Sequence, residues 1–174
     1  MARSHSSRII KYHFGLRVKS EKIQLPPKVE WLFPYSVAET RSVMTQFYDK
    51  YYGDFNPRKL IFGINPGRLG AGITGVPFTD PVRLQVECGI ENSFPQKREL
   101  SAEFIYSIVH KYGGLEKFYT EFYISSVCPL GFVKEGINFN YYDDKNLQQS
   151  VRQFIVENIS IQIKLVNGNR EIAF

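Results

Sequence analysis

The chain has 174 residues, of which 43% are apolar and 22% are charged, and its formal net charge is +5. This length and composition suit one soluble globular domain that is large enough to bury a core. The only two cysteines, Cys88 and Cys128, exclude a four-cysteine iron–sulfur or zinc site built from this chain alone. Without a signal-peptide core or an apolar run of membrane-spanning length, we expect the cytoplasm, or the nucleus in a eukaryote.

The excess positive charge lies at the amino-terminal end. The first thirty residues hold seven Lys or Arg against two Glu, and the remainder holds 15 of each sign. We therefore predict a basic arm over residues 1–34, which would suit contact with a polyanion such as DNA. A solvated tail is the alternative. The arm closes with Trp31-Leu32-Phe33, a cluster that we expect to dock onto the core.

The first helix and the first strand come directly after the arm. Ser36 followed by Glu39 is a capping-box signature, and apolar residues then recur at helical spacing until Gly53. The apolar run 60–62 indicates a buried strand. Residues 64–78 follow with four glycines and two prolines, which predicts a long irregular loop without helix or strand.

Two helices are predicted after this loop. Asp80 before Pro81 forms an N-cap signature for a short helix. After a polar link, Ser101 is expected to cap a second helix, with Leu100 and Ile105 forming a hydrophobic staple. That helix should end at Gly113 because glycine commonly follows the last helical turn.

The rest of the chain predicts a strand, a long helix and a further strand. Residues 122–127 form the second strand, which runs into a breaker loop over 128–132. A long helix should begin at Asp143 or Asp144 and end before Asn167. Residues 171–174 open a third strand, where the sequence stops, so we expect a domain truncated at its carboxyl end. Alternating strands and helices indicate the α/β class with a parallel sheet.

The glycine loop matches the dinucleotide-binding pattern G-x-G-x-x-G over residues 70–75. However, these glycines come several residues after the strand, and Pro77 stands where a helix should open towards a pyrophosphate. The chain also lacks the Gly-Lys-Ser/Thr of a phosphate-binding loop. A nucleotide-cofactor enzyme therefore remains only a weak alternative.

The loop as a whole resembles the first active-site motif of the uracil-DNA glycosylase superfamily, in its single-strand-selective monofunctional branch. The resemblance rests on Gly63-Ile64-Asn65-Pro66-Gly67, on Thr74-Gly75-Val76-Pro77-Phe78 and on Val127-Cys128-Pro129-Leu130. It covers about residues 35–174 and leaves the arm outside. It implies a three-layer α/β/α fold around a four-stranded parallel sheet, which in this sequence would be incomplete.

The resemblance also implies roles for individual residues. Asn65 would position the attacking water, main-chain amides at Ile64 and Gly67 would hold the base carbonyls, and Phe78 would stack on the base. A base must leave the duplex before such a pocket can reach its glycosidic bond. An amide is no strong base, so catalysis would depend on stabilising the leaving group.

Two departures from the family pattern stand out. Ser126 occupies the place of an Asn that reads uracil, and a hydroxyl cannot form that paired contact. Uracil selectivity is therefore open, and xanthine or another deaminated base is an alternative substrate. In addition, the His-Pro motif of the family has no counterpart in this sequence. The second departure leads to the hypothesis of a truncated glycosylase with weak or no activity.

The sequence thus predicts a monomeric DNA repair glycosylase that acts on uracil without metal or cofactor. Its partner would be single- or double-stranded DNA, with Arg68, Lys97 and Arg98 as candidate phosphate contacts. The competing hypothesis is a catalytically defective module that binds DNA or a nucleobase.

Overall fold

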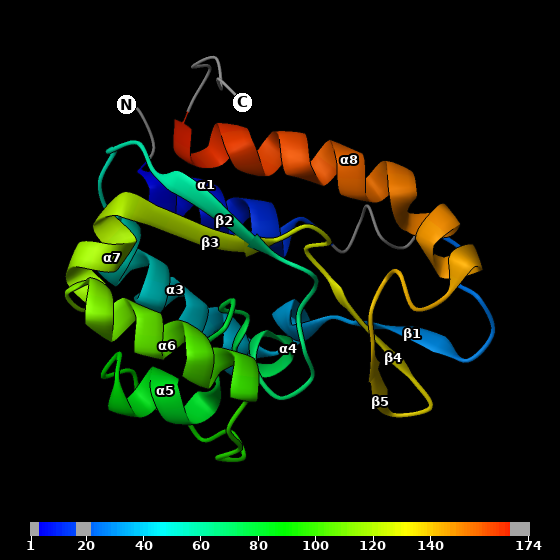
Figure 1. Ribbon diagram of the computed structural model, residues 1–174, viewed down its shortest axis with the longest axis horizontal. Helices are drawn as coiled ribbons and strands as arrows, with labels where there is room; N and C mark the ends of the chain where they lie inside the picture. Colours follow the sequence, from blue (N-terminus) through cyan, green and yellow to red (C-terminus); the bar gives the residue numbers. More distant parts are fainter. Residues whose placement is uncertain (1–3, 17–21, 168–174) are drawn as a thin grey trace.

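A computed structural model describes residues 4–16 and 22–167 of the chain (Figure 1). The helices are α1 His5–Phe14, the 3-10 turn η1 Pro34–Ser36, α3 Ala38–Tyr52, α4 Ala71–Thr74, α5 Pro81–Val86, α6 Leu100–Tyr112, α7 Leu115–Glu121 and α8 Lys145–Asn167. The strands are β1 Val29–Leu32, β2 Lys59–Gly63, β3 Phe122–Ser126, β4 Gly131–Lys134 and β5 Ile137–Phe139.

The strands form two small sheets. β2 and β3 pair in parallel, with Lys59 opposite Phe122 and Gly63 opposite Ser126. β1, β4 and β5 form an antiparallel sheet in the order β1-β4-β5. The predicted α/β class and both predicted parallel strands are confirmed. The predicted third strand, residues 171–174, lies outside the described residues.

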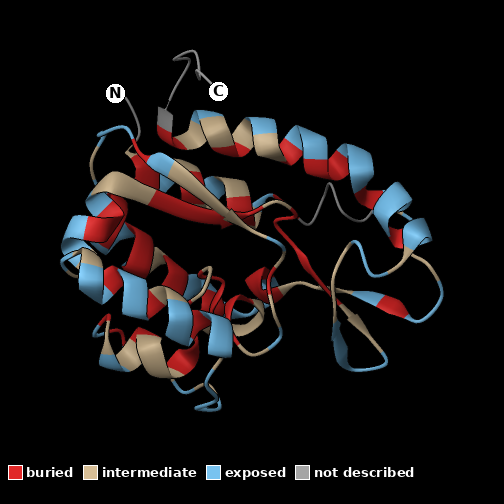
Figure 2. Ribbon diagram, viewed as in Figure 1, coloured by how far each residue is buried: buried red, intermediate tan, exposed pale blue. Residues whose placement is uncertain are grey.

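Helices cover the β2–β3 pair on two sides. α8 lies along one side, and α3, α5, α6 and α7 gather on the other (Figure 1). Buried residues line the inward faces of α3 and β3 (Figure 2). The core is rich in tyrosine and phenylalanine, including Phe47, Tyr48, Tyr52, Tyr106 and Tyr123, each at most 2% exposed. Large rings packed at this density account for much of the apolar area that the fold buries.

Some predicted helix ends are confirmed. Asp80 accepts a hydrogen bond from Arg83 N at 2.9 Å at the start of α5, with Pro81 in the first turn. Asp144 Oδ1 accepts hydrogen bonds from two main-chain amides of α8, at Asn146 and Leu147. Both carboxylates compensate amides that have no partner within the helix.

Other predicted helix ends are wrong. Val37, not Ser36, is the N-cap of α3, and Glu39 instead accepts hydrogen bonds from the amide and hydroxyl of Ser93. Glu99, not Ser101, is the N-cap of α6. The staple is absent because Leu100 is 87% exposed. In α3 a contact with a distant segment replaces the local capping pattern, whereas the N-cap of α6 makes no side-chain capping hydrogen bond.

The predicted arm differs from the structure. Residues 5–14 form helix α1, which packs against α3 and α8 and buries Ile9 completely. The Tyr12 hydroxyl donates to Asn158 Oδ1 of α8 at 3.0 Å. Trp31 docks as expected, with its ring 4.7 Å from that of Phe132. The amino-terminal segment is therefore part of the core rather than a solvated tail over residues 5–16.

Two local elements within the predicted loops were missed. The one-turn helix α4 interrupts the glycine loop and ends at Gly75, whose φ of 73° lies in the left-handed region. β4 and β5 form a hairpin where the sequence predicts a breaker loop and a polar passage. Its turn contains Glu135 and Gly136, both with positive φ, which is the geometry of a tight hairpin turn. Among the described helices, none combines the length and apolar character needed to cross a membrane.

The buried imidazole of His13 on α1 predicts acid sensitivity. Burial lowers the pKa of His13 to about 3, and its Nδ1 is hydrogen-bonded to the Tyr35 hydroxyl at 2.9 Å. The unfolded chain therefore binds a proton below about pH 6.5 that the folded chain excludes, so stability falls as the pH decreases. Between pH 6.5 and 4.5 this contribution is about 2–3 kcal/mol.

We predict that His13→Gln loses less stability than wild type over this pH interval, measured by urea denaturation at several pH values. His110→Gln, at a side chain that is 52% exposed, is the control. A pH dependence equal to wild type in His13→Gln would contradict this account.

Candidate active site

A cavity of about 330 Å³ opens where β2 and β3 end. Its walls come from four segments that are distant in sequence: the end of β2 with the glycine loop, Phe78, the start of α6 and the residues around β5. The lining residues are Gly63, Ile64, Asn65, Gly67, Phe78, Glu99, Ser101, Asn138 and Asn140. Predicted base-binding residues Ile64, Gly67 and Phe78 thus meet the predicted catalytic Asn65 in one place.

The paired strands fix the first wall of this cavity. Beyond the last pair of the ladder, Val127 N donates to Gly63 O at 2.8 Å and Cys128 N donates to Ile64 O at 3.0 Å. The two chains therefore leave the sheet side by side. This continued pairing holds the backbone of residues 63–65 in a defined position at the strand ends.

The Asn65 amide connects the glycine loop to the β5 segment. Its Oδ1 accepts a hydrogen bond from Tyr141 N at 3.2 Å, and its Nδ2 donates to Phe139 O at 3.4 Å. The second bond is long for an N–H donor and is correspondingly weak. Nδ2 also donates to Pro66 O at 3.4 Å, so the protein orients the side chain while both of its N–H groups make only long, weak bonds that a better-placed acceptor can replace.

Phe78 stands over the end of β2 because residue 63 is glycine. A Cβ at position 63 would lie 2.5 Å from Phe78 Cζ, so any larger side chain would displace the ring. Phe78 also has a φ of 53°, a left-handed conformation that is strained for an aromatic residue. Such strain persists only where surrounding contacts impose it.

Those contacts come from two buried threonines, Thr74 and Thr79, which come before and after Phe78 in the sequence. The Thr74 hydroxyl donates to Thr79 O at 2.7 Å and accepts from Val76 N at 3.1 Å. The Thr79 hydroxyl is hydrogen-bonded to the Tyr106 hydroxyl at 3.0 Å. The turn that carries Phe78 is therefore tied to itself and to α6.

Glu99 is a cavity residue that the sequence analysis did not identify. Its carboxylate lies against Gly67 and Gly70, where no Cβ intervenes, and its main-chain amide donates to Asp80 Oδ2 at 2.9 Å. Burial raises the pKa of the Glu99 carboxyl, and the nearby Asp80 carboxylate adds to the effect. Glu99 is the one acidic side chain lining this cavity among the described residues. No local motif marks it, because its neighbours are about thirty positions away.

The remaining predicted site residues lie outside the cavity wall. Ser126 is buried at the end of β3, where its carbonyl accepts a hydrogen bond from Gln162 Nε2 at 3.1 Å. Arg68, Lys97 and Arg98 are exposed on the loops beside the cavity. Their roles in reading the base and binding phosphate stay predictions. Within residues 4–16 and 22–167, no group of three acidic, His or Cys side chains could hold a metal ion.

A family model described as the uracil DNA glycosylase superfamily matches residues 50–174. The chain belongs to this superfamily. The crystal structure of wild-type SMUG2 from Pedobacter heparinus is similar over 95% of this chain and 73% of that chain, at 42% sequence identity and a TM-score of 0.89. No curated protein matches the sequence.

The structural match corrects the predicted extent of the family resemblance. The sequence analysis placed the first 34 residues outside it, yet a match over 95% of the chain leaves out only about nine residues. Most of the predicted arm therefore has a counterpart in the glycosylase structure. This agrees with the burial of α1 against α3 and α8.

The threonine contacts predict a cost for removing one hydroxyl. Thr74→Val keeps the side-chain shape but leaves Val76 N and Thr79 O without their buried partner, which should destabilise the fold by about 1–3 kcal/mol. Thr74→Ser keeps the hydroxyl and is the matched control. Urea denaturation measures the difference, and equal stability of the two variants would show that the hydroxyl does not constrain this turn.

Proposed function

We propose that this chain is a monofunctional DNA glycosylase that hydrolyses the N-glycosidic bond between uracil and deoxyribose in DNA. Membership of the superfamily and the similarity to SMUG2 support glycosylase chemistry. The observation that carries the proposal is the cavity itself, which combines an oriented amide, an aromatic ring and glycine backbone at one strand end. We further propose that the protein acts as a monomer in the cytoplasm, or in the nucleus of a eukaryote.

In the proposed reaction the damaged base leaves the strand and enters the cavity. Phe78 stacks on one face of the base, while main-chain amides at Ile64 and Gly67 bind its carbonyl oxygens. Asn65 Nδ2 exchanges its long bond to Phe139 O for a water molecule that attacks the sugar carbon. The C–N bond breaks, the base leaves with the bonding electrons, and fixed dipoles stabilise the charge that develops on it. The water oxygen forms the new bond to the sugar carbon and releases one proton to the solvent, and the departed base takes up a proton from the solvent.

We assign the Glu99 carboxyl a role in accepting a hydrogen bond from a ring N–H of the base. Its position on the cavity wall supports this assignment. Uracil and xanthine both offer such a donor, so this contact does not separate them. Ser126, with a single hydroxyl in place of an amide, offers less discrimination as well.

These two features predict a broad base preference. The loss of one paired contact corresponds to about 1–3 kcal/mol. We therefore expect the excision rates of uracil and xanthine to differ by less than about 200-fold, which corresponds to 3 kcal/mol. Single-turnover excision from oligonucleotides with one modified base measures this ratio. A uracil excision rate at least ten thousand times the xanthine excision rate would contradict the prediction.

The Asn65→Ala variant tests the proposed function. It should lose at least about 100-fold in the rate of uracil excision, because a positioned polar group at the reacting centre is removed. Its affinity for a uracil-containing oligonucleotide should stay within a few-fold of wild type. Thermal unfolding shows whether the variant is folded, since the amide also bonds Tyr141 N.

Excision and binding assays, together with thermal unfolding in the presence of NAD or ATP, separate the alternatives. A catalytically defective module would bind the oligonucleotide with no excision in wild type or variant. A nucleotide-cofactor enzyme would show no preference for DNA and would be stabilised thermally by NAD or ATP. Either result would overturn the proposal.

A further inference from the structure

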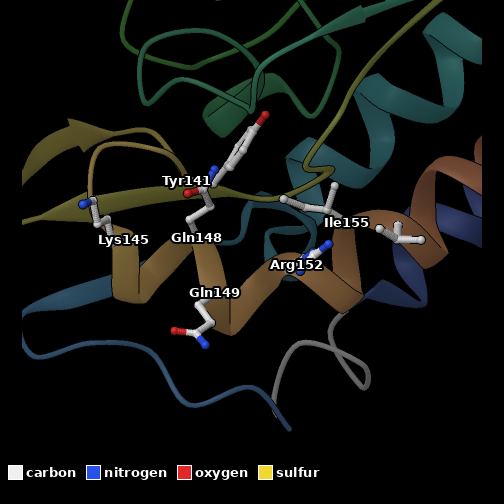
Figure 3. Close-up of a pocket in the computed structure, with 7 residues that line it drawn as sticks. Tyr141, Lys145, Gln148, Gln149, Arg152 and Ile155 are labelled. Atoms are coloured by element: carbon white, nitrogen blue, oxygen red, sulfur yellow. The ribbon is translucent and has the colours of Figure 1, made fainter.

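A second cavity, of about 450 Å³, lies along the amino-terminal half of α8. Its lining combines cationic, amide, aromatic and aliphatic side chains, among them Tyr141, Lys145, Gln148, Arg152, Ile155 and Val156. We call these six residues the α8 groove. Figure 3 shows Gln148 reaching from the helix towards Tyr141, whereas Gln149 points to the opposite side of the helix.

The groove residues of α8 follow one face of the helix. Lys145, Gln148 and Arg152 are separated by three and four positions, which places them on the same side. Seven residues of helix rise by about 10 Å, so the two cations are about 10 Å apart along the axis. A nucleic-acid strand in a duplex advances about 3.4 Å per phosphate, so this span covers about three phosphates.

The two cations are available to a ligand. Lys145 and Arg152 are exposed, and no ion pair within the described part of the chain includes either. The neighbouring acids are occupied elsewhere. Asp144 caps α8 and lies 3.9 Å from Lys134 Nζ, and Asp143 accepts a hydrogen bond from Asn140 N at 2.8 Å. The groove lining itself contains two cationic side chains and no acidic one.

The groove adjoins the active-site cavity. Asn140 lines the cavity, and the next residue, Tyr141, lines the groove. Tyr141 N also donates to Asn65 Oδ1 at 3.2 Å, so the backbone between the two hollows is fixed to the proposed catalytic residue. A polymer whose base occupies the cavity would have its neighbouring residues within reach of the groove.

We infer that the α8 groove binds the DNA strand next to the extruded nucleotide. Lys145 and Arg152 contact two phosphates of the same strand about three positions apart, Gln148 hydrogen-bonds the backbone or a base edge, and the Tyr141 ring stacks on a flanking base. Aromatic rings beside a cationic track are the usual means of holding single-stranded nucleic acid without regard to sequence. The inference rests on the proposed function, because the groove leads from the proposed base pocket.

The test measures binding of a fluorescein-labelled oligothymidylate, which contains no uracil, by fluorescence anisotropy over a range of salt concentrations. The double variant Lys145→Gln/Arg152→Gln should bind about tenfold more weakly at low salt. The slope of log affinity against log salt should fall by about 1.4, since each lost phosphate contact contributes about 0.7 for single strands. Tyr141→Leu should also weaken binding, by about fivefold or more, through loss of stacking.

The matched control is Lys111→Gln/Lys117→Gln, which removes the same charge from exposed positions on α6 and α7. It should bind nearly as tightly as wild type. Equal affinity of the groove variant and wild type, or an equal loss in the control, would overturn the inference. Because the probe lacks uracil, its binding is measured independently of excision. If the groove binds the probe but the enzyme excises no uracil, the proposed function fails and the groove inference stands. If uracil is excised but the groove variant binds as wild type does, the groove inference alone fails.

Discussion

The parallel pairing of β2 with β3 is the constraint on which the site depends. The register sets Gly63 opposite Ser126, and two further hydrogen bonds carry the pairing into the loops beyond. Because both strands end at the same edge, the glycine loop and the segment after β3 must meet there. Neighbouring parallel strands also require a covered crossover, here α5, α6 and α7, and this crossover brings Glu99 to the cavity wall.

Glycine residues and one strained backbone conformation then shape the cavity. Gly63 admits the Phe78 ring, and Gly67 with Gly70 admits the Glu99 carboxylate. Phe78 remains in a left-handed conformation because buried hydroxyls hold the turn on both sides. The amide, the ring and the carboxyl are thus positioned before any ligand arrives, as electrostatic stabilisation of a departing base requires.

Much of this arrangement could be predicted from local sequence signals. Apolar runs revealed β2 and β3, and the Asp80-Pro81 pair revealed α5. The family resemblance of the glycine loop placed Asn65 and Phe78 in one predicted site, and both line the same cavity. The predictions that failed concern features that are set by contacts between residues distant in the sequence. The basic composition of the segment that forms α1 suggests an exposed arm, and only its packing against α3 and α8 shows that one face is buried.

Glu99 was missed for the same reason, because its carboxylate lies against Gly67 and Gly70, about thirty residues away, and no nearby motif marks it. The β4–β5 hairpin did have a local signal, the Glu135-Gly136 turn, but its strands are too short and polar to stand out. The most direct test of the account is a crystal structure of Asn65→Ala bound to a uracil-containing oligonucleotide. We predict the uracil out of the strand and stacked on Phe78 in the 330 Å³ cavity. A uracil that remains stacked in the strand, or that binds elsewhere, would contradict the account.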